Sequence, residues 1–173
     1  MNEVLKCLKE RRSVRKYRSE QIKDSELEQI LEAGTYAPTG MGMQSPIMVA
    51  VQDPETIAKL SKMNAAVMGV TSDPFYGAPT VIVVLADRSR GTYVEDGSLV
   101  MGNLMNAAES LGVASIWIHR AKEEFELPEY KQLLKDLGVE GEWEGIGHCV
   151  VGYADGDLPK AAPRKENRVF WVE

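Results

Sequence analysis

Apolar residues at helical spacing predict two helices near the start of the chain. The first is expected to run to about Arg12, and its apolar stripe comprises Val4, Leu5 and Leu8. The second begins with a capping box, Ser25 followed by Glu28, and stops at the turn sequence "GTYAP". Its stripe comprises Leu27, Ile30, Leu31 and Gly34.

Continuous apolar runs bounded by turn residues predict the strands of a sheet that is covered on both faces. The runs are "IMVAV" (47–51), "TVIVVLAD" (80–87), "ASIWIH" (114–119) and "GIGHCVVGY" (145–153). Loops rich in glycine and proline, such as "PTGMGMQSP" and "TSDPFYGAP", separate these runs from the predicted helices.

Further helices are predicted between the strands. Asp53 caps one helix, with Pro54 in its first turn, and the others cover residues 96–112 and 128–138. Alternating helices and strands are typical of a doubly wound parallel sheet. Two helices precede the first strand and a long arm follows the last, however, so this pattern equally allows a mixed sheet.

The composition predicts one well-packed domain over residues 1–173, because the chain is 44% apolar and long enough to bury a sizeable core. No apolar run is long enough to cross a bilayer, and the first ten residues lack the features of a secretory signal. We therefore expect a cytoplasmic protein. A formal net charge of −6 argues against nucleic acid as the main partner.

The last twenty residues, 154–173, form a C-terminal arm beyond the last predicted strand. The arm begins with a proline-rich cationic piece and ends in the apolar sequence "RVFWV". We expect this arm to pack on another subunit.

Motifs for chemistry that relies on protein groups are absent. The sequence holds no G-x-x-x-x-G-K-[ST] phosphate loop and no G-x-S-x-G elbow, and "GIGHCVVG" leads into a strand instead of opening a helix. We interpret His119 and His148 as hydrogen-bonded side chains at strand ends and not as metal ligands, and Cys7 and Cys149 show no zinc spacing. We expect no metal, and an enzyme of this composition would need a cofactor.

Two groups of cationic residues stand near the chain ends. The N-terminal cation group is Arg11, Arg12, Arg15 and Lys16; the arm cation group is Lys160, Arg164, Lys165 and Arg168. If the first helix continues, Arg11 and Arg15 lie one turn apart with the Ser13 hydroxyl between them, a set that suits a phosphate monoester. The alternative is that these side chains are solvated and complement the helix dipole.

The loop "APTGMGMQSP" (37–46) allows a second hypothesis. Its glycines let the backbone approach a flat ligand, and Gln44 offers both a donor and an acceptor. The loop can equally be a plain surface connection, and Met41 and Met43 can either cover an aromatic ring system or fill gaps in a core.

Five segments in order resemble the FMN-dependent nitroreductase family in its compact form. They are "RRSVRKY", "LEAGTYAPTGMGMQSPIMVAV", "FYGAPTVIVVLAD", "DGSLVMGNLMNAAESLGVASIWI" and "GHCVVGYADGDLPKAAPRK". The resemblance implies an α+β fold, with a mixed central sheet flanked by helices, in an intertwined homodimer that holds two FMN molecules at its interface. The arm would then pack on the partner subunit.

The resemblance also implies which residues bind FMN. They are Arg11, Arg12, Ser13, Arg15, Pro38, Thr39, Gln44, Asn64, Trp117, Ile118, His119, Arg164 and Lys165. Arg15 would reach the flavin pyrimidine edge, and the rest of the opening motif, with Arg164 and Lys165, would reach phosphate and ribityl. Residues 38–44 would come from the partner, Asn64 would lie near the ring, and residues 117–119 would pass the ring with backbone atoms.

The implied activity is reduction of electron-poor acceptors by NADH or NADPH in a ping-pong reaction. The loop departs from the common family pattern Asn-Arg-Gln-Pro, because Gly42 and Met43 precede Gln44. Substrate preference is therefore not implied. Three alternatives remain: a flavin-binding redox sensor or store, a flavin-free module that binds an acidic protein, and a relative that fragments its own flavin.

Overall fold

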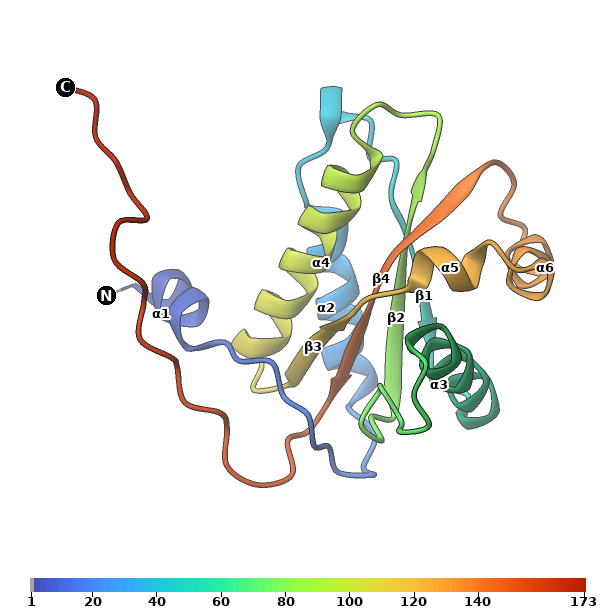
Figure 1. Cartoon of the computed structure of the whole chain (residues 1–173), viewed down its shortest axis with the longest axis horizontal. Helices are drawn as coiled ribbons and strands as arrows, with labels where there is room; N and C mark the ends of the chain where they lie inside the picture. The colour runs from blue at the N-terminus through green and yellow to red at the C-terminus, as the bar shows by residue number, and fades with distance from the viewer. Residues whose placement is uncertain (1) are drawn as a thin grey trace.

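Four strands form one antiparallel sheet in the computed structural model, which describes residues 2–173 (Figure 1). The strand order is β1-β2-β4-β3. In chain order the elements are α1 (Glu3–Glu10), α2 (Asp24–Thr35), the 3₁₀ turn η1 (Gly40–Gly42), β1 (Ile47–Val51), α3 (Pro54–Met68), β2 (Thr80–Asp87), α4 (Tyr93–Ser110), β3 (Ala114–Ile118), α5 (Ala121–Phe125), α6 (Pro128–Asp136) and β4 (Trp143–Gly152).

The predicted α+β class is confirmed, and a doubly wound parallel sheet is excluded. Every neighbouring pair of named strands is antiparallel. The parallel contact is an isolated bridge between Ser13 and Ser115, at the outer edge of β3. The helices therefore do not act as parallel crossovers but cover the two faces of the sheet.

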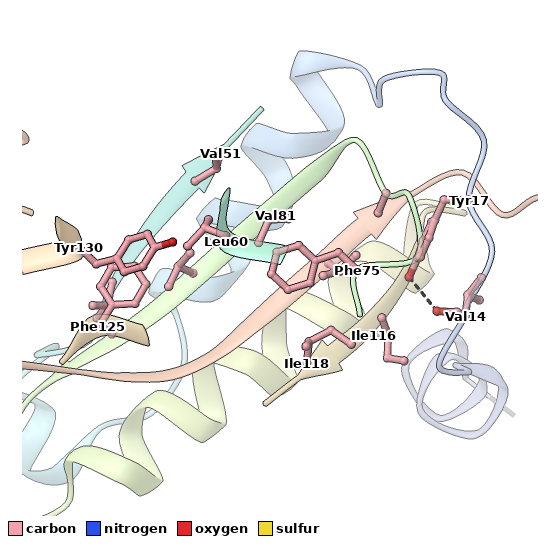
Figure 2. Packing of buried hydrophobic residues seen from close by; sticks show 14 of the residues in the cluster. Val14, Tyr17, Val51, Leu60, Phe75, Val81, Ile116, Ile118, Phe125 and Tyr130 are labelled. Carbon is pink, nitrogen blue, oxygen red and sulfur yellow. Dashed lines mark hydrogen bonds between the residues drawn. The ribbon is translucent and has the colours of Figure 1, made fainter. Parts of the chain in front are cut away.

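Helices cover both faces of the sheet (Figure 1). Residues of α2 and α4 pack with Ile82 and Val84 of β2 on one face. Residues of α3, α5 and α6 pack with Val81 and Val83 on the other, in the cluster that Figure 2 shows. Because successive side chains of β2 point to opposite faces, this central strand is apolar almost throughout.

Several element boundaries differ from their predictions. The helix α1 ends at Glu10, before Arg12, and α4 begins at Tyr93, before the predicted start at residue 96. The predicted capping box at Ser25 and Glu28 is wrong: α2 begins at Asp24, because the Glu26 carboxylate accepts a hydrogen bond from the backbone N–H of Lys23 at 3.0 Å. The short helix α5 was not predicted.

The arm, residues 154–173, contains no helix or strand in the structure. Its root is fixed to the N-terminal part of the chain, because the Asp155 N–H donates to the Lys16 carbonyl and the two side chains form an ion pair at 2.6 Å. From there the arm extends away from the sheet (Figure 1). Its large apolar side chains near the end, Phe170 and Trp171, are each 82% exposed.

Two kinds of feature are absent from residues 2–173. None of the described helices combines the length and the apolar character that a membrane span needs. No group of three or more His, Cys, Asp and Glu side chains in this part of the chain is arranged to hold a metal ion.

Candidate flavin site

Residues 11–15, the opening segment, leave α1 and run along the outer edge of β3. The backbone turns to an extended conformation at Arg11, and the Val14 N–H donates to the Ser115 carbonyl at 3.1 Å. Arg11 and Arg15 are therefore not one helical turn apart, which corrects the helical arrangement predicted for them. The edge of β3 offers a backbone partner that a continued helix would not reach.

Arg11 carries a buried group without a partner. Its Nη1 is buried and makes no hydrogen bond within residues 2–173. The guanidinium lies near Glu109 of α4 and Cys149 of β4, and its positive charge acts to lower the pKa of both groups. Burial is the larger effect, so both pKa values are raised. Burial raises the pKa of Cys149 to about 12. Arg11 is thus an under-satisfied cation between α1, α4 and β4.

The other members of the opening segment differ in their environments. Arg12 donates from Nη1 to the carbonyls of Lys9 and Arg11, both at 2.7 Å, so it satisfies carbonyl groups at the end of α1. This contact fits the helix-terminus interpretation of that side chain. Ser13 is half-buried beside β3, whereas Arg15 is exposed and makes no hydrogen bond or ion pair within the described residues.

The end of β3 brings three predicted residues together. Trp117 is half-buried, Ile118 is buried and His119 is exposed. The His119 carbonyl accepts a hydrogen bond from Asn64 Nδ2 of α3 at 2.8 Å. Ser13 is paired with the start of the same strand, about 13 Å away at the usual rise per residue. The edge strand β3 therefore has the opening segment beside its start and residues 117–119 at its end, where Asn64 of α3 contacts the chain.

Asn64 is 0% exposed and its amide is fully engaged. Besides its bond to His119, Nδ2 donates to Glu124 Oε2 at 3.1 Å, and Oδ1 accepts from Arg120 Nε at 2.9 Å. Any effect of Asn64 on a ligand must therefore pass through the residues that it holds.

The loop that carries Pro38, Thr39 and Gln44 is fixed at the start of α4. Asp96 accepts the Gly40 N–H at 2.8 Å, and Thr39 Oγ1 accepts the Gln44 N–H at 2.9 Å. The opening segment lies beside β3, which follows the other end of α4, and this 18-residue helix is about 27 Å long at 1.5 Å per residue. A single chain does not bring the loop and the opening segment together.

The cationic part of the arm makes no bond to the opening segment within the described residues of one chain. Arg164 and Lys165 are exposed, and Arg164 donates from Nε and Nη2 to the Ala162 carbonyl. No hydrogen bond or ion pair joins the arm cation group to the N-terminal cation group in residues 2–173.

The sequence did not identify several polar residues of this region. Asp96, Arg120 and Glu124 were missed, and His148 was wrongly placed at a strand end: it lies in the middle of β4, opposite Val83, and is 0% exposed. Neither ring nitrogen of His148 makes a hydrogen bond within residues 2–173, which corrects the prediction of a hydrogen-bonded side chain. A histidine inside an apolar strand is nevertheless expected to contact another polar group. That signal was present, but it could not name Glu124 as the partner.

A groove of about 960 Å³ lies elsewhere, between α3 and the loop before β2. None of the residues predicted to bind FMN lines it.

Known proteins that are similar to this chain are nitroreductases and flavin reductases. Residues 8–153 match the model of the "Nitroreductase family". A protein of Archaeoglobus fulgidus, named for NADH dehydrogenase and NAD(P)H nitroreductase, is 33% identical over 139 residues, which are 78% of this chain and 77% of that protein. The "FMN reductase [NAD(P)H]" of Bacillus subtilis is 28% identical, over 80% of this chain and 66% of its own length.

A crystal structure of a nitroreductase with bound FMN from Bacteroides fragilis shares the whole fold. It is 32% identical, has a TM-score of 0.89, and the alignment covers 100% of both chains. A second FMN-bound nitroreductase, from Desulfitobacterium hafniense, is 28% identical with a TM-score of 0.87, again over 100% of both chains.

Proposed function

The chain belongs to the nitroreductase family, and we propose that it is an FMN-dependent oxidoreductase, which uses NADH or NADPH to reduce small electron-poor acceptors such as nitroaromatics or quinones. The FMN-bound relatives support the cofactor, because two of them share the entire fold with this chain. The relatives named for NAD(P)H support the nicotinamide co-substrate.

The observation that carries the proposal within this molecule is the buried Nη1 of Arg11 without a hydrogen bond. Leaving a charged donor buried and unpaired is costly, so an acceptor from outside the chain is expected there. A phosphate monoester supplies both oxygen acceptors and negative charge. The half-buried Ser13 follows two residues later on the same edge of the sheet, so the residues present fit the FMN phosphate.

The chain's own residues would bind the cofactor and set its electrostatic environment. Arg11 and Ser13 would hold the phosphate, with Arg164 and Lys165 of the arm, and residues 117–119 would lie along the ring. When bound, FMN would supply the hydride chemistry between the nicotinamide and the acceptor, in ping-pong order. Arg15, which is exposed and has no bonding partner in residues 2–173, would stabilise negative charge at the ring edge by its positive charge.

We further propose that the working form is a homodimer in which the arm packs on the partner subunit. Apolar side chains are exposed on α1, where Val4 and Leu8 are 68% and 54% exposed, and at the end of the arm. The loop with Pro38, Thr39 and Gln44 lies at the opposite end of α4 from the opening segment, so it would contribute to the partner's flavin site. Light scattering should give a dimer; a monomeric FMN-loaded protein would refute this arrangement.

The cytoplasm is the proposed location. Cys7 and Cys149 are free thiols, as a reducing compartment requires.

The decisive experiment is the visible spectrum of the purified protein, with FMN supplied, before and after anaerobic addition of NADH or NADPH. We expect a flavin spectrum that bleaches within the time of turnover and returns on addition of a nitroaromatic or quinone. Reduction far slower than turnover would instead indicate a redox sensor or flavin store. A colourless protein that takes up no FMN would refute the proposal.

Arg11→Ala tests the phosphate contact. It should weaken FMN binding about tenfold or more, because a hydrogen bond to a charged group contributes about 1.5–3 kcal/mol and each 1.4 kcal/mol is about a factor of ten. Lys131→Gln, an exposed cation on α6, is the matched control and should leave FMN affinity unchanged. Equal affinities for all three proteins would remove Arg11 from the site.

A further inference from the structure

A buried polar network runs from the centre of the sheet to the turn after β3. On β4, His148 Nε2 lies 2.9 Å from Oε2 of Glu124, which belongs to α5. The same carboxylate oxygen accepts a hydrogen bond from Asn64 Nδ2 on α3, and Asn64 Oδ1 accepts one from Arg120 Nε. The side chains of β4, α5 and α3 are thus connected in series to the guanidinium group of Arg120, in the turn after β3.

The network gives the Asn64 amide one orientation. Its Nδ2 faces two acceptors, the Glu124 carboxylate and the His119 carbonyl, while its Oδ1 faces Arg120, which can only donate. A rotated amide would place oxygen against both acceptors and nitrogen against the donor. Glu124 therefore fixes Asn64, and Asn64 fixes Arg120.

This arrangement is unfavourable for folding alone. Glu124 and His148 are both 0% exposed. The contact between Nε2 and Oε2 is not aligned as a hydrogen bond. Within residues 2–173, neither ring nitrogen of His148 nor Oε1 of Glu124 has a hydrogen-bond partner. Apolar side chains of similar volume would serve a core at least as well.

Arg120 itself adopts an unfavourable backbone conformation. Its φ is 76°, in the left-handed region that glycine enters without strain and other residues rarely occupy. Such strain is concentrated at functional sites. Strain at Arg120, together with the buried Glu124 carboxylate that is linked to it through Asn64, indicates a functional role for the Arg120 side chain.

The two Nη groups of Arg120 make no hydrogen bond within the described residues. Only Nε makes a hydrogen bond within the described residues, and the side chain is half-exposed beside the exposed His119. In contrast, Lys122 of α5 already contacts the Glu144 carboxylate, at 3.3 Å. The two Nη groups of Arg120 can therefore bind a ligand. A planar guanidinium best matches the two oxygens of a carboxylate or phosphate.

On the basis of the proposed function, which places residues 117–119 along the flavin ring, we propose that Arg120 is a specificity-determining residue. It binds an oxyanion, carboxylate or phosphate, of the small molecule that reacts beside the end of β3. Asn64 and Glu124 are positioning residues that hold its guanidinium. The protein therefore prefers oxyanion-bearing molecules to neutral ones of the same shape.

Calorimetric binding to the oxidised FMN-loaded protein tests this proposal without turnover. The probes are 4-nitrobenzoate and its neutral counterpart 4-nitrobenzamide. Arg120→Gln should weaken 4-nitrobenzoate binding about tenfold, or about 1.4 kcal/mol, and leave 4-nitrobenzamide within about twofold. Arg120→Lys keeps the charge without the fork and should lose less. Lys131→Gln should change neither.

The same variants, titrated with NAD⁺, which carries the nicotinamide diphosphate but cannot donate a hydride, distinguish the two sources of the oxyanion. A loss confined to 4-nitrobenzoate places the oxyanion on the acceptor, and a loss confined to NAD⁺ places it on the nicotinamide diphosphate; either supports the proposal. Asn64→Ala should lower the same affinity by a smaller factor, because it releases the Arg120 side chain.

Three results would overturn the proposal: unchanged affinities in Arg120→Gln, equal weakening of 4-nitrobenzoate and 4-nitrobenzamide, or weaker FMN binding, which would make Arg120 a flavin ligand. Failure of the proposed function would be recognised separately. A wild-type protein that binds FMN and discriminates the two probes, but is not reduced by NADH or NADPH, refutes that function and leaves the assignment of Arg120 intact.

Discussion

Gly145 lies where β4 meets the start of α5, and replacing it with alanine should destabilise the protein. Gly145 pairs with Leu85, next to a register shift between Val84 and Leu85 in β2. A Cβ at this position would overlap the carbonyl group of Ala121, the first residue of α5. That carbonyl is backbone and cannot rotate out of the way, so α5 or the strand itself must move.

The expected loss follows from the cost of overpacking. Inserting a methyl group into a filled core costs about 1–3 kcal/mol, and we expect the upper part of this range because the obstacle is backbone. In a protein of this size, 1 kcal/mol corresponds to about 2–4 °C in Tm. A loss of about 2–3 kcal/mol should therefore lower Tm by about 4–12 °C.

Thermal unfolding of the FMN-loaded protein, followed by circular dichroism, measures this loss. Gly147→Ala is the matched variant on the same strand: its Cβ would lie 2.5 Å from Nε1 of Trp117, a side chain that can rotate, so the decrease in Tm should be smaller. If Gly145→Ala unfolds at the wild-type temperature, or if Gly147→Ala loses more, the close packing of β4 against α5 is not as described.

Three further changes have defined outcomes. Gly102→Ala in α4 should stabilise the protein by about 0.5–1 kcal/mol in urea unfolding, because its Cβ meets no atom within 4 Å; a loss would mean that another chain packs there. At pH 8, a thiol reagent should leave Cys149 unmodified in the native protein, since burial raises its pKa to about 12, and should modify Cys7 slowly, since burial raises that pKa too; a fast reaction of both thiols without denaturant would contradict this. Hydrogen bonds from Thr56 lower the pKa of Asp53, the N-cap of α3, so Asp53→Ala should lower Tm at neutral pH, and the deficit should shrink as the pH falls below about 4; a deficit that does not change with pH would refute this reason.

The sequence predicted the fold best where local pattern and burial agree. The bounds of β2 and β1 were predicted to the residue, because each is a short apolar run that ends in polar or turn-forming residues. The five-residue α5 was missed because it is too short to show a helical period. The sheet direction could not be derived from the alternation of elements, since antiparallel and parallel sheets share that alternation.

The candidate site was predicted only as far as contiguous motifs reach. The opening segment was identified from its cations, but its conformation was not, because pairing with Ser115 decides it and that residue lies about a hundred positions later. Arg120 and Glu124 were missed for the same reason. Their partners, Asn64 and His148, come from other elements, and nothing in a single sequence relates those positions.

The pairing of the opening segment also determines when the proposed flavin site can form during synthesis. Ser13 and Val14 are held by Ser115, and Lys16 and Arg18 by backbone groups of Asp155 and Tyr153. Residues 13–18 are synthesised early, but they can adopt their native conformation only after residues 115, 153 and 155 have been synthesised. On the proposed assignment of the opening segment, a nascent chain on the ribosome has to expose nearly its full length before the flavin site can bind FMN, so FMN would be bound by completed chains and not by intermediates.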